Sequence, residues 1–189
     1  MIFVTDARGR CVYACPEWEA LTGQPSTEAL DRGWVLRVHP DDRGTATGIL
    51  DEALASGAEF SIRYRLLKPD DTPRWVGAGG VPSFGIENGA FIGYLGSITE
   101  LAGGATDTIA AYGNVGRFVP PPPHPATMPI DTLDLIADHL IITHSLIEED
   151  DGAKAALPGA RIALLEVGLA LAARMRMQGR SLNLSLIHI

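Results

Sequence analysis

The chain has 189 residues, of which 46% are hydrophobic and 20% are charged, with a net charge of −8. This composition predicts a globular protein with one domain of about 100 residues and a smaller appendage. The acidic balance argues against a nucleic-acid partner or an anionic membrane surface.

The first predicted elements are two short strands, I-F-V-T and C-V-Y-A, joined by a turn at residues 6–9. A helix then begins at Pro16 and ends at Gly23. Short helical segments follow at residues 27–30 and 34–38, and a longer helix spans about residues 42–55. The H-P-D-D motif before the longer helix suggests a metal site through His39, but we favour Asp41 or Asp42 as the helix cap.

Residues 59–100 carry the clearest pattern, three β-like stretches in close succession. In the first stretch Phe60, Ile62, Tyr64 and Leu66 alternate with polar residues, as in a half-buried antiparallel strand. The second is R-W-V-G-A-G-G-V-P, whose glycines indicate a bulge or a close packing approach. The third, A-F-I-G-Y-L-G-S-I-T-E, follows an Asn-Gly turn. Such hairpins cannot stand alone in water, so another part of the chain has to cover their apolar face.

The C-terminal part changes in character. Residues 102–128 are rich in Gly and Pro and predict a linker, in which P-P-P-P is a stiff spacer rather than an adaptor ligand. Residues 129–178 predict a helical hairpin, with Asp131 as the cap of its first helix. Both helices are too apolar to be solvated on every side, so we expect them to pack against the sheet or a second subunit. Residues 179–189 form a tail that we interpret as non-native or truncated.

Five motifs in this order resemble the PAS sensory domain, over about residues 1–101. They are W-E-A-L-T-G, H-P-D-D, F-S-I-R-Y-R-L, R-W-V and I-G-Y-L-G-S-I-T-E. The last of them lies in the part of the family called the PAC motif, and the subgroup is PAS fold-3-like. The resemblance implies an α+β fold with a five-stranded antiparallel sheet and short helices on one face, followed here by the helical hairpin.

The resemblance also implies a function. We expect a non-enzymatic sensory module of signal transduction, which binds a small ligand or a protein partner and relays the event to the C-terminal helices. The alternative is the input fragment of a larger signalling enzyme such as a histidine kinase, with the catalytic part absent from this chain. His139 and His144 lie on a helix of the kind that carries a phosphoacceptor, but neither has the H-E-x-x-x-P context. We therefore expect a histidine at a helix interface.

PAS domains hold flavin, haem or other small molecules between sheet and helices, or bind only partners. The N-C-R-F-L-Q motif of cysteinyl-flavin domains is absent, and no histidine for haem lies within residues 43–56, so both cofactors are disfavoured. A pocket would be lined by inward-facing residues, and these are Trp34, Ile49, Phe60, Ile62, Tyr64, Trp75 and Tyr94. The simpler interpretation is that these residues only pack the core. No catalytic or metal-binding residue is expected.

The two cysteines, Cys11 and Cys15, form neither a disulfide framework nor a C-x-x-C pair, and we expect them to be small core residues. The longest apolar stretch, residues 162–175, is interrupted by Glu166 and Arg174, so no membrane span is expected. No secretory signal opens the chain. These features predict a cytoplasmic protein, and the apolar hairpin predicts a homodimer or a signalling-protein partner.

Overall fold

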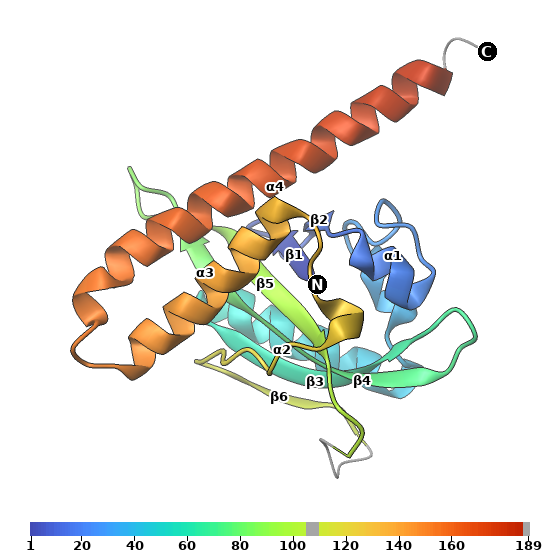
Figure 1. Ribbon diagram of the computed structural model, residues 1–189, viewed down its shortest axis with the longest axis horizontal. Coiled ribbons are helices and arrows are strands. Elements are labelled where there is room, and N and C mark those ends of the chain that lie inside the picture. The colour runs from blue at the N-terminus through green and yellow to red at the C-terminus, as the bar shows by residue number, and fades with distance from the viewer. Residues whose placement is uncertain (105–109, 187–189) are drawn as a thin grey trace.

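The computed structural model describes residues 1–104 and 110–186. Within these residues lies an antiparallel sheet of six strands in the order β2-β1-β5-β4-β3-β6 (Figure 1). The strands are β1 (Ile2–Thr5), β2 (Cys11–Ala14), β3 (Phe60–Leu67), β4 (Pro73–Phe84), β5 (Phe91–Glu100) and β6 (Tyr112–Val115). The α-helices are α1 (Glu17–Thr22), α2 (Arg43–Ser56), α3 (Thr132–Glu149) and α4 (Leu157–Leu186). Short 3₁₀ helices are η1 (Gly33–Arg37), η2 (Pro40–Asp42), η3 (Pro125–Thr127) and η4 (Lys154–Ala156).

Helices cover both faces of the sheet. The segment α1, η1 and α2 lies on one face, here called the inner face, and the α3–α4 hairpin crosses the opposite, outer face (Figure 1). The predicted α+β fold is confirmed, with one strand more in the described residues than the five expected. The alternation predicted for β3 is confirmed, since Phe60, Ile62, Tyr64 and Leu66 are all buried. The residues of β3 that are buried are therefore those that the alternation in the sequence predicts.

The short helix predicted at residues 27–30 is wrong, because this segment forms only turns. Its backbone is redirected at Asp31, which adopts a left-handed conformation with φ 55° and exchanges two backbone hydrogen bonds with Cys11. An α-helix cannot continue through a residue with positive φ.

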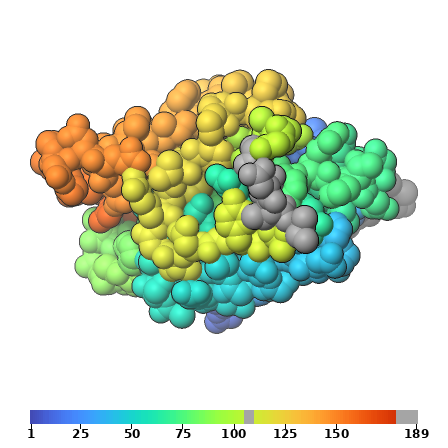
Figure 2. Space-filling view, turned by 90° about the horizontal axis from the view of Figure 1, so that it is seen from below, coloured from blue at the N-terminus to red at the C-terminus, as the bar shows by residue number. Residues whose placement is uncertain are grey.

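The segment predicted as a linker contributes to the sheet. Strand β6 pairs antiparallel with β3, from Phe60 opposite Val115 to Arg63 opposite Tyr112. Figure 2 shows the segment, in yellow, packed between the cyan part of the molecule and the orange helices. Phe118 follows β6 and is only 2% exposed. Residues 105–109 of the predicted linker lie outside the described residues.

The segment after β6 can pack closely on the outer face because β4 has glycines there, which carry no side chain. A Cβ at Gly79 would lie 2.3 Å from the ring of Phe118, and one at Gly77 would lie 2.6 Å from the ring of Pro121. The predicted close packing approach at these glycines is therefore confirmed. The proline run is no free spacer, because Pro121 lies directly on the sheet.

The predicted hairpin corresponds to α3 and α4, which pack against each other and against β1 and β5. Asp131 caps α3, since its side chain accepts a hydrogen bond of 2.9 Å from the Leu133 N–H. Helix α4 passes over β5 at Gly168, where a Cβ would lie 4.0 Å from the Leu95 Cβ. The helix continues to Leu186, and residues 187–189 of the predicted tail lie outside the described residues.

One helix in the described part of the chain, Lys154–Gln178, is long and apolar enough to cross a membrane by length and composition alone. This differs from the expectation drawn from the interruptions at Glu166 and Arg174. A single helix of this kind is weak evidence for a membrane span. The side of α4 that packs in the protein carries buried Leu164, Leu171 and Met175.

Candidate functional site

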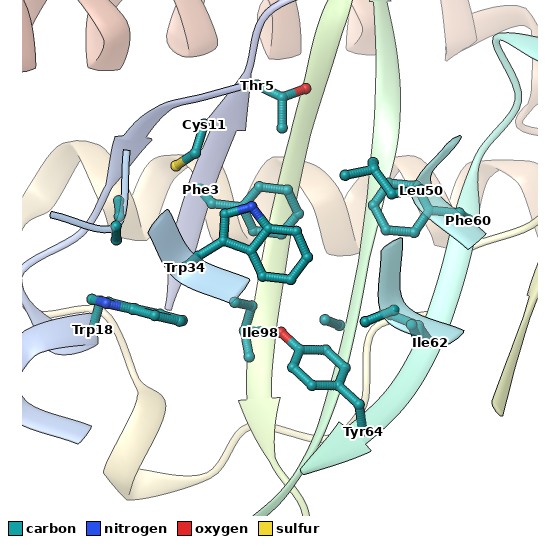
Figure 3. A pocket seen from close by; sticks show the side chains of 14 residues that line it. Phe3, Thr5, Cys11, Trp18, Trp34, Leu50, Phe60, Ile62, Tyr64 and Ile98 are labelled. Atoms are coloured by element: carbon teal, nitrogen blue, oxygen red, sulfur yellow. The ribbon is translucent and has the colours of Figure 1, made fainter. Parts of the chain in front are cut away.

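A cavity of about 60 Å³ lies between the inner face of the sheet and the helices α1, η1 and α2. Figure 3 shows aromatic and aliphatic side chains converging on it from both layers. The lining residues are Phe3, Thr5, Cys11, Ala14, Trp18, Ala29, Trp34, Ala46, Leu50, Phe60, Ile62, Tyr64, Ala78 and Ile98. The volume is well below the ~150 Å³ of an engineered apolar cavity that takes up benzene, and below the ~300–1,000 Å³ of drug-sized ligand pockets.

The structure brings four of the seven predicted pocket residues together in this cavity. They are Trp34, Phe60, Ile62 and Tyr64. The three from β3 line it because alternate residues of a strand share one face of the sheet. Trp34 reaches it from η1, on the helical side (Figure 3).

The other three predicted residues do not line the cavity, for different reasons. Trp75 is paired with Arg65, so it lies on the outer face, where the Arg65 guanidinium is 5.5 Å from its ring centre. Ile49 is half-buried, while α2 presents Ala46 and Leu50 to the cavity. Tyr94 is on the inner face but beyond the cavity, with its hydroxyl donating to the backbone oxygens of Ala53 and Ala58.

Sequence reasoning missed ten lining residues. Some carried a usable signal: Phe3 and Ile98 follow the period-2 pattern of β1 and β5, and Trp18 and Leu50 follow the helical pattern of α1 and α2. Small residues such as Ala29 line the cavity because they leave space, and nothing in the sequence distinguishes them from other small core residues.

The cavity is apolar, and most polar groups on its walls already have partners. The Thr5 hydroxyl accepts a hydrogen bond of 3.0 Å from the Tyr94 N–H, and the Cys11 thiol donates to the Tyr13 carbonyl. The Tyr64 hydroxyl points into the interior, toward Ile98 (Figure 3). Burial raises the pKa of Tyr64, so this hydroxyl stays protonated and can both donate and accept. The cavity therefore offers the Tyr64 hydroxyl to an otherwise apolar guest.

Both cysteines are buried free thiols. Burial raises the pKa of the Cys11 thiol, which lines the cavity, to about 12. Burial also raises the pKa of Cys15 to about 12. A protonated thiol is a weak nucleophile and a weak metal ligand, so these residues behave as small core side chains.

The H-P-D-D motif has a different role from the one predicted. The His39 side chain, not a carboxylate, caps η2 by accepting from the Asp41 N–H. Asp42 is 1% exposed and makes no cap; it accepts from the Arg65 backbone N–H at 2.8 Å and from the Arg65 guanidinium at 2.9 and 2.5 Å. Burial alone would raise the pKa of Asp42, but the hydrogen bonds from Arg65 outweigh it and leave the pKa below its usual value. The pair ties the start of α2 to β3 beside the cavity.

The outer face connects the sheet to the hairpin through polar contacts. The Tyr13 hydroxyl lies 2.8 Å from both carboxylate oxygens of Asp134, which is 0% exposed. The His144 Nδ1 of α3 lies 3.4 Å from a carboxylate oxygen of Glu59, directly before β3. The hairpin is therefore fixed to strands whose opposite side lines the cavity.

The two histidines of α3 lie in different environments. His139 is exposed, whereas His144 is 1% exposed and lies between Glu59 and Glu148. In this arrangement His144 is not accessible to a phosphotransfer partner.

An antiparallel sheet that encloses an apolar cavity against short helices and carries a docked helical hairpin is a domain of the α+β class. Residues 11–98 match the family model described as the PAS fold. This part of the chain is a PAS domain, a signal-sensing module found in signalling proteins. The resemblance drawn from the sequence motifs is confirmed.

Two curated relatives match parts of the chain. An uncharacterized protein, y4lL of Sinorhizobium fredii, is 32% identical over 101 residues, which are 53% of this chain and 12% of the relative. The White collar 2 protein of Neurospora crassa is 39% identical over 67 residues, which are 35% of this chain and 13% of the relative. The matching segments thus cover only about an eighth of the length of these relatives.

Solved structures are also similar. A PAS domain of a Colwellia psychrerythraea protein has 25% identity and a TM-score of 0.45, covering 53% of this chain and 84% of that chain. A Rhodobacter sphaeroides LOV protein has 18% identity and a TM-score of 0.48, covering 95% of this chain and 90% of that chain.

Proposed function

We propose that the chain senses a small ligand in the cavity and relays its presence to the α3–α4 hairpin. One observation carries this proposal: the same strands line the cavity on one face and hold the hairpin on the other. In β1, Phe3 faces the cavity, while its neighbours Ile2 and Val4 are buried on the outer face. In β5, Ile98 faces the cavity, while Leu95 is buried beneath α4 at Gly168. A shift of either strand therefore changes both surfaces.

The lining suggests the ligand class. Apolar walls and a volume of about 60 Å³ suit a compact, mostly apolar molecule with one polar atom directed at the Tyr64 hydroxyl. Entry of a larger molecule, including a flavin or haem, requires the helical layer to move, and Trp34 of η1 is only half-buried. A ligand shifts the equilibrium between two conformations only when it binds one of them more tightly than the other. The relay therefore depends on how far the helical layer moves between the ligand-free and the ligand-bound conformation.

A cavity-filling substitution tests the relay without knowledge of the ligand. Ala46→Leu adds bulk from α2 into the cavity, while Ala55→Leu makes the same change at an exposed position of the same helix. We expect Ala46→Leu to alter amide hydrogen exchange in α3 and α4 of the full chain, and Ala55→Leu to leave it unchanged. Xenon uptake, followed by NMR, reports whether the cavity is filled. A filled cavity with unchanged exchange in both helices contradicts the relay.

The relay needs an output at the α3–α4 hairpin. We propose a homodimer formed through the hairpin, supported by apolar side chains exposed on both helices, at Ile136 (43%), Leu146 (60%), Ile162 (48%) and Leu169 (45%). Such a patch suits a second copy or a signalling partner. Light scattering of the full chain and of a Leu169→Glu variant tests this, and a monomeric wild-type chain contradicts it.

We propose that the protein is cytoplasmic and has no catalytic activity of its own. The two buried free thiols are consistent with a reducing compartment. The rival function is an input fragment of a larger signalling enzyme such as a histidine kinase. The burial of His144 disfavours this residue as a phosphoacceptor. The reading frame beyond Ile189 separates the two, because an ATPase domain encoded there favours the second.

A further inference from the structure

A cluster of potential metal ligands lies where the hairpin meets the sheet, away from the cavity. Glu59 precedes β3, His144 and Glu148 lie one turn apart near the end of α3, and Arg161 approaches from α4. One ligand atom from each of the residues Glu59, His144 and Glu148 lies within 4.8 Å of the other two. The PAS cavity uses none of these residues.

The spacing suits a single ion. The His144 Nδ1 is 3.4 Å from a Glu59 carboxylate oxygen, and the His144 Nε2 is 4.0 Å from a Glu148 carboxylate oxygen. Zinc bonds to His nitrogen and carboxylate oxygen are ~2.0–2.2 Å long, so two ligands of one tetrahedral ion lie about 3.4 Å apart. Glu59 and His144 have this spacing already. Glu148 lies beside the other ring nitrogen, Nε2, and its side chain is 27% exposed, so it has to turn toward Nδ1 to join them.

The histidine supplies an independent sign of a missing ligand. His144 is 1% exposed, and its Nδ1 has no hydrogen-bond partner among the described residues. Buried polar atoms are rarely left unsatisfied, because each unmade hydrogen bond is costly. An imidazole nitrogen is a common ligand of zinc in proteins. Glu59 is held in place by the Phe118 N–H on its other oxygen, which leaves the oxygen near His144 free.

The charges of the cluster also favour a cation. The Glu59 side chain is only 9% exposed, so its carboxylate is poorly solvated. The resident cation is Arg161, which donates to the Glu148 carboxylate at 3.1 Å and to the His144 Nε2 at 3.4 Å. The Arg161 side chain is 53% exposed, so it can move into solvent. A divalent ion with two carboxylates leaves a neutral site, whereas Arg161 alone leaves one negative charge.

We propose that Glu59, His144 and Glu148 bind a divalent transition-metal ion of the Zn²⁺ class, which displaces Arg161 and joins α3 to the start of β3. The set of one imidazole and two carboxylates has the ligand types of zinc sites, and water completes the coordination on the side that Arg161 leaves. The ion would hold the hairpin to the PAS sheet. This inference does not depend on a ligand in the cavity.

The test is calorimetric titration of Zn²⁺ into chelator-treated full chain, with Mg²⁺ as the comparison ion and Co²⁺ absorption as a direct spectroscopic readout. We expect Zn²⁺ to bind and Mg²⁺ not to bind. Glu148→Gln, at the accessible edge, and His144→Asn are each expected to weaken Zn²⁺ binding at least tenfold. His139→Asn, which removes the exposed histidine of the same helix, is the matched control and is expected to keep the affinity.

Arg161→Ala gives the sharpest result, because removal of the competing cation is expected to tighten Zn²⁺ binding rather than weaken it. Glu148→Gln leaves the buried His144 in place, so it remains informative if His144→Asn does not fold. The proposal is overturned if wild type shows no Zn²⁺ binding and no Co²⁺ visible absorption. It is equally overturned if Glu148→Gln binds Zn²⁺ as tightly as wild type, or if His139→Asn alone removes binding.

Discussion

The buried ion pair between Asp42 and Arg65 allows a quantitative prediction for Asp42→Asn. Asparagine keeps the volume of the side chain, so no cavity forms, but it loses the charge that faces the guanidinium. Hydrogen bonds to charged groups are worth ~1.5–3 kcal/mol each, and breaking a buried pair costs ~3–5 kcal/mol. The remaining amide oxygen can still accept from the Arg65 N–H, and Arg65 is 17% exposed, so we expect a loss of about 3 kcal/mol in unfolding free energy.

The assay is urea unfolding of the full chain, together with Arg65→Met and the double variant. Methionine keeps the apolar stem of Arg65 against Trp75. The coupling energy of the cycle is expected to be about 1–3 kcal/mol. Asp51→Asn is the control, because its pair with Arg32 is exposed and such pairs are worth ~0–1 kcal/mol. A cost for Asp42→Asn no larger than that of the control, or a coupling below about 0.5 kcal/mol, refutes this reasoning.

Three further predictions concern the outer face and the thiols. Phe118→Ala is expected to lower the free energy of unfolding by about 3–5 kcal/mol, because a ring that is 2% exposed is lost from the sheet. The neighbouring Val119→Ala removes a side chain that is 49% exposed and is expected to change the free energy of unfolding little. Equal losses for the two variants in urea unfolding would show that the Phe118 ring is not packed as described. Burial raises the pKa of Asp134 to about 6, so the folded chain holds this proton between about pH 4 and 6 when the unfolded chain has lost it, and stability falls by about 2 kcal/mol as the pH rises through that window. Asp134→Asn is expected to remove this fall in a series of urea titrations, and parallel pH profiles of the two proteins would contradict the assignment. A thiol reagent at pH 8 is expected to react with Cys11 and Cys15 only as fast as the protein unfolds, since both thiols are buried and have pKa values of about 12. Rapid labelling of the folded chain would contradict the burial of these thiols.

The strands of the sheet were predictable because local sequence determines them. In β3 the alternation from Phe60 to Leu66 specifies which side chains are buried, whatever they pack against. Asp131 was predictable as a cap for the same reason, since its partner is two residues away. The family motifs added the order in which these elements combine.

The wrong sequence-based predictions concern residues whose position or role depends on partners far away in the sequence. Trp75 is a large apolar residue in a strand, but its pairing with Arg65 places it on the outer face, and register is not visible in a single sequence. Asp42 looked like a helix cap because its true partner, Arg65, is 23 residues away. Strand β6, Y-G-N-V, has two residues at its centre, Gly113 and Asn114, that are depleted in strands, and it forms because β3 provides an edge to pair with.

The addition of β6 to the sheet bears on how this protein has to be handled in the test tube. Without β6, the backbone of β3 from Phe60 to Arg63 would present unpaired N–H and C=O groups beside an alternating apolar row, the usual template for intermolecular strand addition. A fragment cut just after β5 would retain every PAS motif yet expose this edge. Solubility should therefore decline when the chain is shortened at residue 101 and return when it is extended past Phe118, whose ring secures the added strand.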